Sequence, residues 1–452
     1  MPELPEVETV KRRLTPSVVG KTIKSVEVFY NKYDCLNVIS NEKIESIERK
    51  GKFLIFNLSN HRMISHLRME GKYRIENINP IKSKHDLVFF HLDDSTLVYN
   101  DVRKFGVFKV FDKDTDVYKE EPLINVGEEP FTATKEYLLN KLKGKTGHIK
   151  SLLLDQSILS GLGNIYVDEV LFMSKINPFK KGSDIKEEEA DRIIKNSVIV
   201  LNKAINAGGT TIRSFESFNG ESGHFQGSLL IHEREGERCY NCGNFVLKTK
   251  CNGRGTYYCP TCQRSHEYKT FAVTGGFASG KSTVMSFIKE LGYETYSLDE
   301  IYNELFTSSK PMQREIFSLF KTLDKSKLRE IVYNDSNRNN ELKRITHRYV
   351  MQELFRRIEG NLKDIFFIEV PLLYEGNLEK CFDHTIDVYE KDDVRNTILE
   401  KRNISLDFYK LVSSQQMSIE EKKNNSEYVI ENNGSLGSLK EKTSKLIKKI
   451  LN

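Results

Sequence analysis

Two closely spaced pairs of cysteines carry the most specific metal-binding signal in the chain. Cys239 and Cys242 form one CxxC hook, and Cys259 and Cys262 form a second one after sixteen intervening residues. Four thiolates suit tetrahedral Zn²⁺, and a hairpin this small would take much of its folding energy from the metal. Free thiols at this spacing by coincidence are the alternative. The sequence predicts a zinc finger that holds one Zn²⁺, with Cys251 outside the ligand set.

The tip of the predicted finger offers a second chemical feature. Arg254 stands between Gly253 and Gly255 in the run NGRGT. Glycines let a backbone come close to a ligand, and an arginine presented in this way suits a phosphate. The tip is therefore a candidate contact for nucleic acid.

A phosphate-binding motif lies further along the chain, where Gly275, Gly280, Lys281 and Ser282 match GxxxxGK[ST]. An apolar stretch precedes the motif and a helical pattern follows it, which is the context it requires. The backbone amides of such a loop cradle phosphates, Lys281 meets the β/γ charge and Ser282 ligates Mg²⁺. The predicted ATP-binding residues are Gly275, Ala278, Ser279, Gly280, Lys281, Ser282 and Thr283.

Length and composition indicate a soluble globular protein of two to four domains, since the chain has 452 residues, 38% of them hydrophobic and 29% charged. A net charge of +5 argues only weakly for nucleic-acid binding. The chain lacks the long apolar run of a membrane helix, and its start, MPELPEVETV, lacks the pattern of a secretory signal. Without an export signal, paired cysteines indicate metal ligands in a reducing cytoplasm.

The elements that must position these groups differ along the chain. Short β-type runs at 53–59, 87–92 and 106–111 are typical of antiparallel sheets. From 132 to 206 apolar residues recur at three- and four-residue spacing, which predicts helices.

After Arg264 the pattern changes, and strands alternate with helices to the end of the chain. This alternation predicts an α/β fold with a parallel sheet. The Lys-rich segment 440–452 is typical of an amphipathic surface helix.

Residues 1–264 resemble the formamidopyrimidine-DNA glycosylase family. The matching motifs stand in the family's order and are MPELPEVET, HLRMEGKY (66–73), DVRKFG (101–106), IKSLLLDQ and GLGNIYVDE (149–169), GGTTIRS (208–214) and the finger ending in CQR (262–264). The resemblance implies an N-terminal β-sandwich, a helix–two-turn–helix domain and a zinc finger, with glycosylase and AP lyase activity. The start PELPE, rather than PEGPE, favours oxidised purines such as 8-oxoguanine and formamidopyrimidine as the lesions.

The glycosylase chemistry would begin at the second residue. Removal of Met1 would expose the secondary amine of Pro2, which can attack C1′ of a deoxyribose and form an iminium. Glu3 beside it can move protons to the ring oxygen and the base. A proline at position two is commonplace by itself, and the motif set gives it this role. By resemblance, Lys52 is the proton donor for β-elimination and Arg254 serves δ-elimination.

The resemblance also implies how damaged DNA is held. Met69, Arg103 and Phe105 would fill the gap left by the flipped base, because an apolar wedge and an aromatic ring replace lost stacking while Arg pairs with the orphaned base. A core side chain is the alternative for Met69 or Phe105. The implied lesion-recognition residues are Glu6, Thr210, Thr211 and Arg213. The implied phosphate contacts are His85, Lys150 and Asn164, with Leu87 departing from the family's pattern.

Residues 271–440 resemble dephospho-coenzyme A kinase. The matching motifs are TGGFASGKST (274–283), SLDEI (297–301), DKSKLREIVYND (324–335), ITH (345–347), EVPLLYE (369–375) and YVIENNGS (428–435). The resemblance implies that Asp299 is the base for the 3′-hydroxyl of the ribose and that Arg402 belongs to the lid. A helix N-terminal aspartate is the alternative for Asp299.

The kinase half departs from its family at four positions. Ser297 replaces an aspartate, Ala278 replaces a P-loop glycine, Arg348 replaces a proline, and Ile398 stands where a lid arginine is expected, with Arg395 as its substitute. The retained Lys281 and Ser282 favour an active kinase.

The sequence thus predicts a multidomain fusion of two enzymes. The predicted segments are a β-sandwich at 1–125, a helix–two-turn–helix domain at 126–230, a zinc finger at 231–264, a linker at 265–269 and a P-loop kinase at 270–452. The expected partners are double-stranded DNA with oxidised purines or abasic sites, ATP with Mg²⁺, and dephospho-coenzyme A, bound by a monomer that meets no membrane.

Two alternatives to this reading stay open. In the first, the glycosylase is fused to an inactive nucleotide-responsive module. In the second, the kinase phosphorylates another nucleoside-like acceptor. We expect the two halves to work when they are expressed separately, split near Ser265–Lys269.

Overall fold

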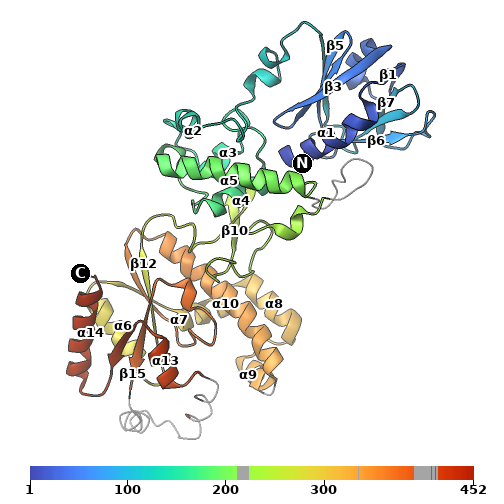
Figure 1. Cartoon of the computed structure of the whole chain (residues 1–452). Helices are drawn as coiled ribbons and strands as arrows, with labels where there is room; N and C mark the ends of the chain where they lie inside the picture. Colours follow the sequence, from blue (N-terminus) through green and yellow to red (C-terminus); the bar gives the residue numbers. More distant parts are fainter. Residues whose placement is uncertain (211–222, 334, 391–408, 410–412, 414–415, 452) are drawn as a thin grey trace. The chain divides into compact units, whose positions relative to one another are not determined.

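The computed structural model describes residues 1–210, 223–333, 335–390, 409, 413 and 416–451 (Figure 1). The chain forms two compact units: one comprises Met1–Glu233 and Lys248–Tyr258, and the other comprises Arg234–Leu247 and Cys259–Asn452. The chain therefore passes between the units at three places, all in or beside the predicted finger. Among the described residues, no helix combines the length and apolar character needed to cross a bilayer.

The N-terminal part of the first unit holds two antiparallel sheets, ordered β1-β3-β4-β5-β9 and β2-β7-β8-β6. Helix α1 (Leu4–Val18) and the sheets share one apolar core, in which Val7, Leu54 and Tyr99 are buried. The strands are β1 (Thr22–Ile23), β2 (Ser25–Val28), β3 (Glu42–Lys50), β4 (Phe53–Leu58), β5 (His61–His66), β6 (Lys72–Glu76), β7 (Asp86–His91), β8 (Thr96–Asn100) and β9 (Val107–Asp112). The predicted strands at 53–59, 87–92 and 106–111 are confirmed as β4, β7 and β9.

The rest of the first unit is mainly helical, as predicted. Its helices are α2 (Lys135–Leu142), α3 (Ile149–Leu153), α4 (Asn164–Met173) and α5 (Glu187–Asn206). The helix predicted from apolar spacing in this region is confirmed as α5, because Ile193, Leu201 and Ile205 are buried on one face. Strands β10 (Leu247–Cys251) and β11 (Arg254–Tyr258) form the two-stranded sheet of the finger.

The second unit is built on a five-stranded parallel sheet, ordered β13-β14-β12-β15-β16. The strands are β12 (Lys269–Gly275), β13 (Glu294–Ser297), β14 (Ile365–Glu369), β15 (His384–Tyr389) and β16 (Tyr428–Glu431). The helices are α6 (Lys281–Glu290), α7 (Leu298–Ser308), α8 (Lys310–Phe320), α9 (Lys325–Tyr333), α10 (Ser336–Glu359), α13 (Ile419–Asn425) and α14 (Leu436–Leu451).

Helices cover both faces of this sheet, which explains its continuous apolar strands (Figure 1). Phe271 and Val273 pack with residues of α6 and α14, whereas Ala272 faces α7 and α10. Helix α14 confirms the predicted amphipathic helix at the Lys-rich end, because it buries Leu439, Thr443 and Ile447. The predicted α/β fold with a parallel sheet is likewise confirmed.

Candidate functional site

The carboxylate of Glu3 caps the N-terminus of α4. Its Oε2 accepts a hydrogen bond from the Gly163 amide at 2.6 Å, and its Oε1 accepts one from the Ile165 amide at 3.0 Å. A Cβ on Gly163 would lie 2.3 Å from Glu3 Cδ, so only glycine permits this approach. Burial raises the pKa of Glu3, although the nearby charge of Lys52 opposes that shift. Pro2, also buried, is thereby held beside a carboxyl group that retains its proton more readily than usual.

Lys52 reaches the same place from the start of β4. Its Nζ donates a 2.8 Å hydrogen bond to the carbonyl of Leu162, next to the glycine that holds Glu3. Burial lowers the pKa of Lys52, and the carboxylates of Glu3 and Glu6 oppose the shift. Burial also lowers the pKa of the Met1 amino group, which interacts electrostatically with the same three side chains. The site therefore joins amines of lowered pKa to a carboxyl group of raised pKa.

Glu6 fixes the start of the chain from the other side. Its Oε2 accepts the Glu3 amide at 2.9 Å, and its Oε1 accepts the amide of Thr210 at 2.7 Å and the hydroxyl of Tyr166 at 2.6 Å. The structure thus brings Glu6 and Thr210 together, while the predicted residues Thr211 and Arg213 lie outside the described ranges. Tyr166 was missed by sequence reasoning, although it lies within the motif GLGNIYVDE.

The tip of the finger is anchored to the same helix. The carbonyl of Gly255 accepts hydrogen bonds from Lys150 Nζ at 2.7 Å and from Asn164 Nδ2 at 3.0 Å. Lys150 is fully buried and pairs with Asp168 at 2.8 Å. Arg254, next to this anchor, is exposed, and its charge contributes to the lowered pKa of Lys52. Lys150 and Asn164, predicted to contact phosphate, here use their polar heads to hold the arginine-bearing tip.

Asp101 organises the loop that carries two predicted DNA contacts. It is fully buried, and its carboxylate accepts the amides of Arg103 at 3.0 Å and Gly106 at 2.8 Å. The Asp101 amide donates to the carbonyl of His85 at 3.0 Å, which ties that predicted residue to the loop through its backbone. The Arg103 guanidinium stacks over the Phe105 ring at 4.7 Å. Because the buried Asp101 carboxylate binds the backbone of this loop, the side chains of Arg103 and Phe105 stay at the surface.

Met69 belongs to a neighbouring loop. Strands β6 and β8 pair Lys72 with Asn100, so the loop before β6 and the loop after β8 leave the same end of the sheet. A Cβ on Gly71 would lie 2.4 Å from the Tyr99 hydroxyl oxygen, and a Cβ on Gly106 would lie 1.8 Å from it. Both loops therefore pack against the same atom. The Met69 side chain is 38% exposed and the Phe105 side chain is 51% exposed, so neither is a core residue.

The P-loop joins β12 to α6 in the second unit. Lys281 Nζ donates to the carbonyls of Gly275 at 3.1 Å and Gly276 at 2.7 Å. Asn432, which follows β16, donates to the Ser279 carbonyl at 2.8 Å and braces the loop from outside. Ala278 has a φ of +68°, so this departure from glycine puts a side chain in a left-handed conformation.

Carboxylates gather at the carboxyl ends of β13 and β14, beside the P-loop. Ser282 Oγ donates to Glu369 Oε1 at 3.0 Å. Asp299 lies in the first turn of α7, and burial raises its pKa while the charge of Lys281 opposes that shift. Ser297 serves as the N-cap of α7 by accepting the Glu300 amide at 3.4 Å, which gives this departure a structural role.

Sequence reasoning missed Glu369 and Asn432 as site residues. Glu369 ends the apolar run IFFIE, and an acidic residue at the carboxyl end of a buried parallel strand is the signal that could have found it. Asn432 lies within the motif YVIENNGS (428–435), but its spacing does not identify it as a brace for the P-loop. Arg402, Arg395 and Ile398 lie outside the described residues.

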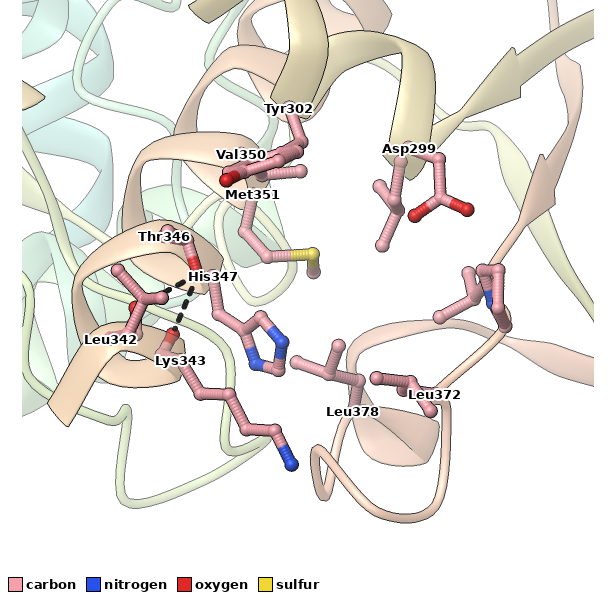
Figure 2. Close-up of a pocket in the computed structure, with 13 residues that line it drawn as sticks. Asp299, Tyr302, Leu342, Lys343, Thr346, His347, Val350, Met351, Leu372 and Leu378 are labelled. Atoms are coloured by element: carbon pink, nitrogen blue, oxygen red, sulfur yellow. Dashed lines mark hydrogen bonds between the residues drawn. The ribbon is translucent and has the colours of Figure 1, made fainter. Parts of the chain in front are cut away.

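A cavity of about 230 Å³ opens beside Asp299 (Figure 2). Its walls come from α7, from α10 and from the loop after β14, and the polar groups among them include Asp299, Tyr302, Lys343 and His347. Burial and the charge of Arg238 lower the pKa of His347 to about 4, so the imidazole is neutral at pH 7. The cavity is thus largely apolar, with a carboxylate on the side of the P-loop.

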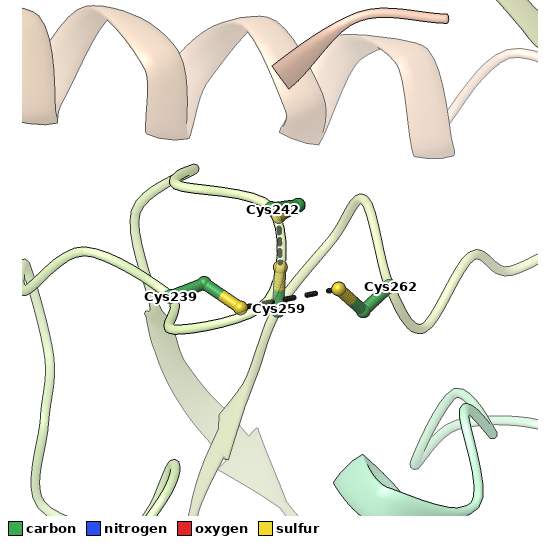
Figure 3. A group of neighbouring side chains, drawn as sticks. All are labelled: Cys239, Cys242, Cys259 and Cys262. Atoms are coloured by element: carbon green, nitrogen blue, oxygen red, sulfur yellow. Dashed lines mark hydrogen bonds between the residues drawn. The ribbon is translucent and has the colours of Figure 1, made fainter. Parts of the chain in front are cut away.

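The four paired cysteines converge in the second unit (Figure 3). Their sulfur atoms all lie within 4.8 Å of one another, with 3.9 Å between Cys239 and Cys262 and 3.4 Å between Cys242 and Cys259. Tetrahedral Zn²⁺ with Zn–S bonds of about 2.3 Å requires sulfur–sulfur distances of about 3.8 Å. The four sulfurs therefore fit a zinc ion, and Cys251 belongs to a separate contact with Ser151.

Comparison with known proteins divides the chain in the same order as its motifs. Family models for the formamidopyrimidine-DNA glycosylase N-terminal domain, its H2TH domain and dephospho-CoA kinase match residues 1–108, 126–216 and 270–438. Formamidopyrimidine-DNA glycosylases of Exiguobacterium sp. and Bacillus cereus are 46% and 45% identical over 276 and 274 residues, which is 58% of this chain and 100% and 99% of theirs.

Solved structures give the same result for the first part of the chain. The Lactococcus lactis Fpg in complex with an abasic-site-containing DNA is 39% identical, with a TM-score of 0.55, and covers 58% of this chain and 100% of its own. A structure of MutM with carbocyclic 8-oxo-G-containing DNA is also 39% identical, with a TM-score of 0.54 over the same shares.

The Asp101 loop generates a first prediction. In Asp101→Asn the side-chain NH₂ group would face the backbone N–H of Arg103 or Gly106, so two donors would meet. We expect the folded state to lose about 2 kcal/mol of stability. Binding of lesion-containing duplex should become roughly tenfold weaker. Thermal unfolding and fluorescence anisotropy measure the two effects. Asp112→Asn, at a side chain 90% exposed, is the matched control. Unchanged DNA affinity in Asp101→Asn would contradict the assigned role of the loop.

Proposed function

We propose two activities for this chain, which belongs to the formamidopyrimidine-DNA glycosylase family and carries a dephospho-CoA kinase domain after its glycosylase part. The first is excision of oxidised purines from double-stranded DNA, followed by β,δ-elimination that nicks the strand. The second is ATP-dependent phosphorylation of the 3′-hydroxyl of dephospho-coenzyme A. The observation that carries the first is the buried Pro2–Glu3 pair at the N-terminus of α4, and the P-loop beside Asp299 and Glu369 carries the second.

Base excision begins with the amine of Pro2 once Met1 has been removed. Burial lowers the pKa of the Met1 amino group at this place. Pro2 is buried beside it, and removal of Met1 would expose its secondary amine, which is the proposed nucleophile. Its lone pair forms the bond to C1′ as the glycosidic bond breaks, and the electrons of that bond leave with the base. Glu3, with its raised pKa, supplies the proton that the ring oxygen or the departing base requires.

The sugar ring then opens: the C1′–O4′ bond breaks, O4′ takes a proton, and the Pro2 nitrogen loses its own proton, which gives an iminium between Pro2 and C1′. Strand cleavage follows from this iminium. Loss of a C2′ proton expels the 3′-phosphate, and loss of a further proton expels the 5′-phosphate. Lys52, whose pKa is lowered by burial, would exchange protons in the first elimination. The exposed Arg254, next to the anchor on Gly255, would serve the second elimination.

Recognition of damage would use both loops at the end of the sandwich. Met69 and Phe105 offer apolar surface to the gap in the stack, and Arg103, stacked on Phe105, offers donors to the unpaired base. Glu6 and Thr210 would face the lesion, together with the predicted Thr211 and Arg213.

The four thiolates would hold one Zn²⁺, whose contribution is structural. In the kinase, Mg²⁺ bound with ATP would neutralise phosphate charge. Ser282, which donates a hydrogen bond to Glu369, would hold this ion. Asp299 accepts the proton of the acceptor hydroxyl, and Lys281 turns from its present carbonyl partners to the β/γ-phosphates. The cavity between α7 and α10 receives the acceptor.

Borohydride trapping tests the glycosylase. We expect a covalent adduct between 8-oxoguanine-containing duplex and the N-terminal peptide that begins at Pro2. Glu3→Gln should slow base excision by about 100-fold or more, while trapping on an abasic duplex persists because its sugar already presents an aldehyde.

Excision by the wild type should fall as pH rises through the raised pKa of Glu3, since the protonated form is lost.

Glu45→Gln, on an exposed ion pair of the same domain, is the control for this series. An adduct on a residue other than Pro2 would exclude the proposed nucleophile. An unchanged pH profile in Glu3→Gln would exclude Glu3 as the acid.

Phosphorylation of dephospho-coenzyme A tests the second unit. Lys281→Ala and Glu369→Gln should each lower kcat by about 100-fold or more, because charge stabilisation and metal placement are lost. Lys289→Ala, exposed on the same helix α6, should be unaffected. Glycosylase activity of the same preparations shows that the proteins are folded.

Wild-type activity in Lys281→Ala would refute the role of the P-loop. ATP binding without transfer to dephospho-coenzyme A would favour the alternative of an inactive or differently specific module. Labelled ATP with a panel of nucleoside-like acceptors separates those two cases.

A further inference from the structure

We propose that the first half of the zinc finger, residues 234–247, is a working part of the kinase, and that Arg238 is a positioning residue for its acceptor cavity. This inference rests on the proposed kinase function and adds to it a dependence on the finger. Residues 234–247 and the kinase form one compact unit, so the contacts between them lie within that unit.

Arg238 clamps the loop that follows β14. Its Nη2 donates to the Gly376 carbonyl at 2.8 Å, and its Nη1 donates to the Asn377 carbonyl at 3.3 Å. The guanidinium is itself fixed, because Nη1 also donates to the Gly243 carbonyl at 2.9 Å and the group stacks over Phe245 at 4.4 Å. A planar guanidinium with several fixed donors suits two adjacent carbonyls in a way that an ammonium does not.

The clamped loop forms one wall of the acceptor cavity. Leu372 and Leu378, on either side of the two clamped carbonyls, both line it, and Figure 2 shows them facing His347. A Cβ on Gly376 would lie 3.1 Å from His347 Cε1, so the loop and the imidazole are already in contact. Asn377 has a φ of +49°, a left-handed conformation that needs support from its surroundings. Arg238 supplies that support from behind the wall.

Other contacts hold the finger against the same region of the kinase. Phe245 is buried in one apolar core with Leu378 and Cys381. Thr261 donates to the Cys381 carbonyl at 3.4 Å, and Arg264 pairs with Asp383 at 2.7 Å.

A further close approach lies on α10. A Cβ on Gly236 would lie 2.2 Å from Arg348 Cδ, so the chain before the first hook lies directly on α10 beside His347. Both cysteine hooks therefore sit on the side of the kinase that supports the cavity.

The zinc ligands are the neighbours of these contacts in the chain. Arg238 precedes Cys239, and Thr261 and Arg264 flank Cys262. A metal that fixes the four sulfurs fixes the backbone from which these side chains extend. The P-loop is braced by Asn432 instead, through the Ser279 carbonyl. Occupancy of the finger is therefore expected to set the affinity for the acceptor and to leave the affinity for ATP unchanged.

The first test uses the full chain with Arg238→Ala. We expect the Kd and KM for dephospho-coenzyme A to rise about tenfold, as for the loss of a charge-assisted hydrogen bond, with the Kd for ATP unchanged and little loss of kcat. Amide hydrogen exchange in residues 372–382 should accelerate. Arg238→Lys should give an intermediate result, and Arg314→Ala, exposed on α8 of the same unit, should have no effect.

The second test withdraws zinc from the full chain with a zinc-selective chelator and measures binding by calorimetry. We expect the same selective loss of affinity for dephospho-coenzyme A, the same faster exchange at 372–382, and recovery when Zn²⁺ alone is added back. This experiment applies even if Arg238→Ala does not fold.

Equal affinity and equal exchange in Arg238→Ala, or in the zinc-depleted chain, would overturn the inference. A wild-type chain that binds no dephospho-coenzyme A would instead contradict the proposed function. In that case the exchange rates at 372–382 still decide whether the finger supports the loop.

Discussion

The bond between the Glu3 carboxylate and the first amides of α4 is the constraint on which the glycosylase site depends. It joins the beginning of the chain to a helix about 160 positions away, and the partial positive charge of the helix N-terminus favours it. Everything around it follows from this anchor. Glu6 locks the backbone of Glu3, Lys52 binds the carbonyl of Leu162, and Asn164 holds the tip that carries Arg254.

The P-loop of the kinase follows the same rule with different residues. There the backbone must turn its carbonyls and amides inward. Residues in left-handed conformations make this turn possible, and a side chain from outside the loop holds it in place. Ala278 takes a conformation that glycine adopts more easily, and Asn432 reaches in from the end of a different strand. In both sites a strained or crowded segment is held by a polar side chain from a distant part of the sequence.

This dependence on distant side chains separates the features that could be predicted from the sequence from those that could not. The antiparallel and parallel sheets, the cysteine set and the P-loop were predictable because each is written in local spacing or apolar periodicity. Tyr166, Asp101 and Glu369 were not named as site residues, because a buried hydroxyl or carboxylate acquires its role from partners that spacing does not identify. Ser297 shows the reverse case, in which a residue that departs from its family's pattern serves as a helix cap.

The boundary between the two enzymes is the feature with the widest consequence. Because the chain passes between its compact units at three places, no single cut separates them cleanly, and a split near Ser265–Lys269 would take Arg238 away from the kinase half that we expected to work on its own. A gene rearrangement that exchanged one kinase for another at a single breakpoint after Arg264 would leave Arg238 and both hooks behind with the old partner.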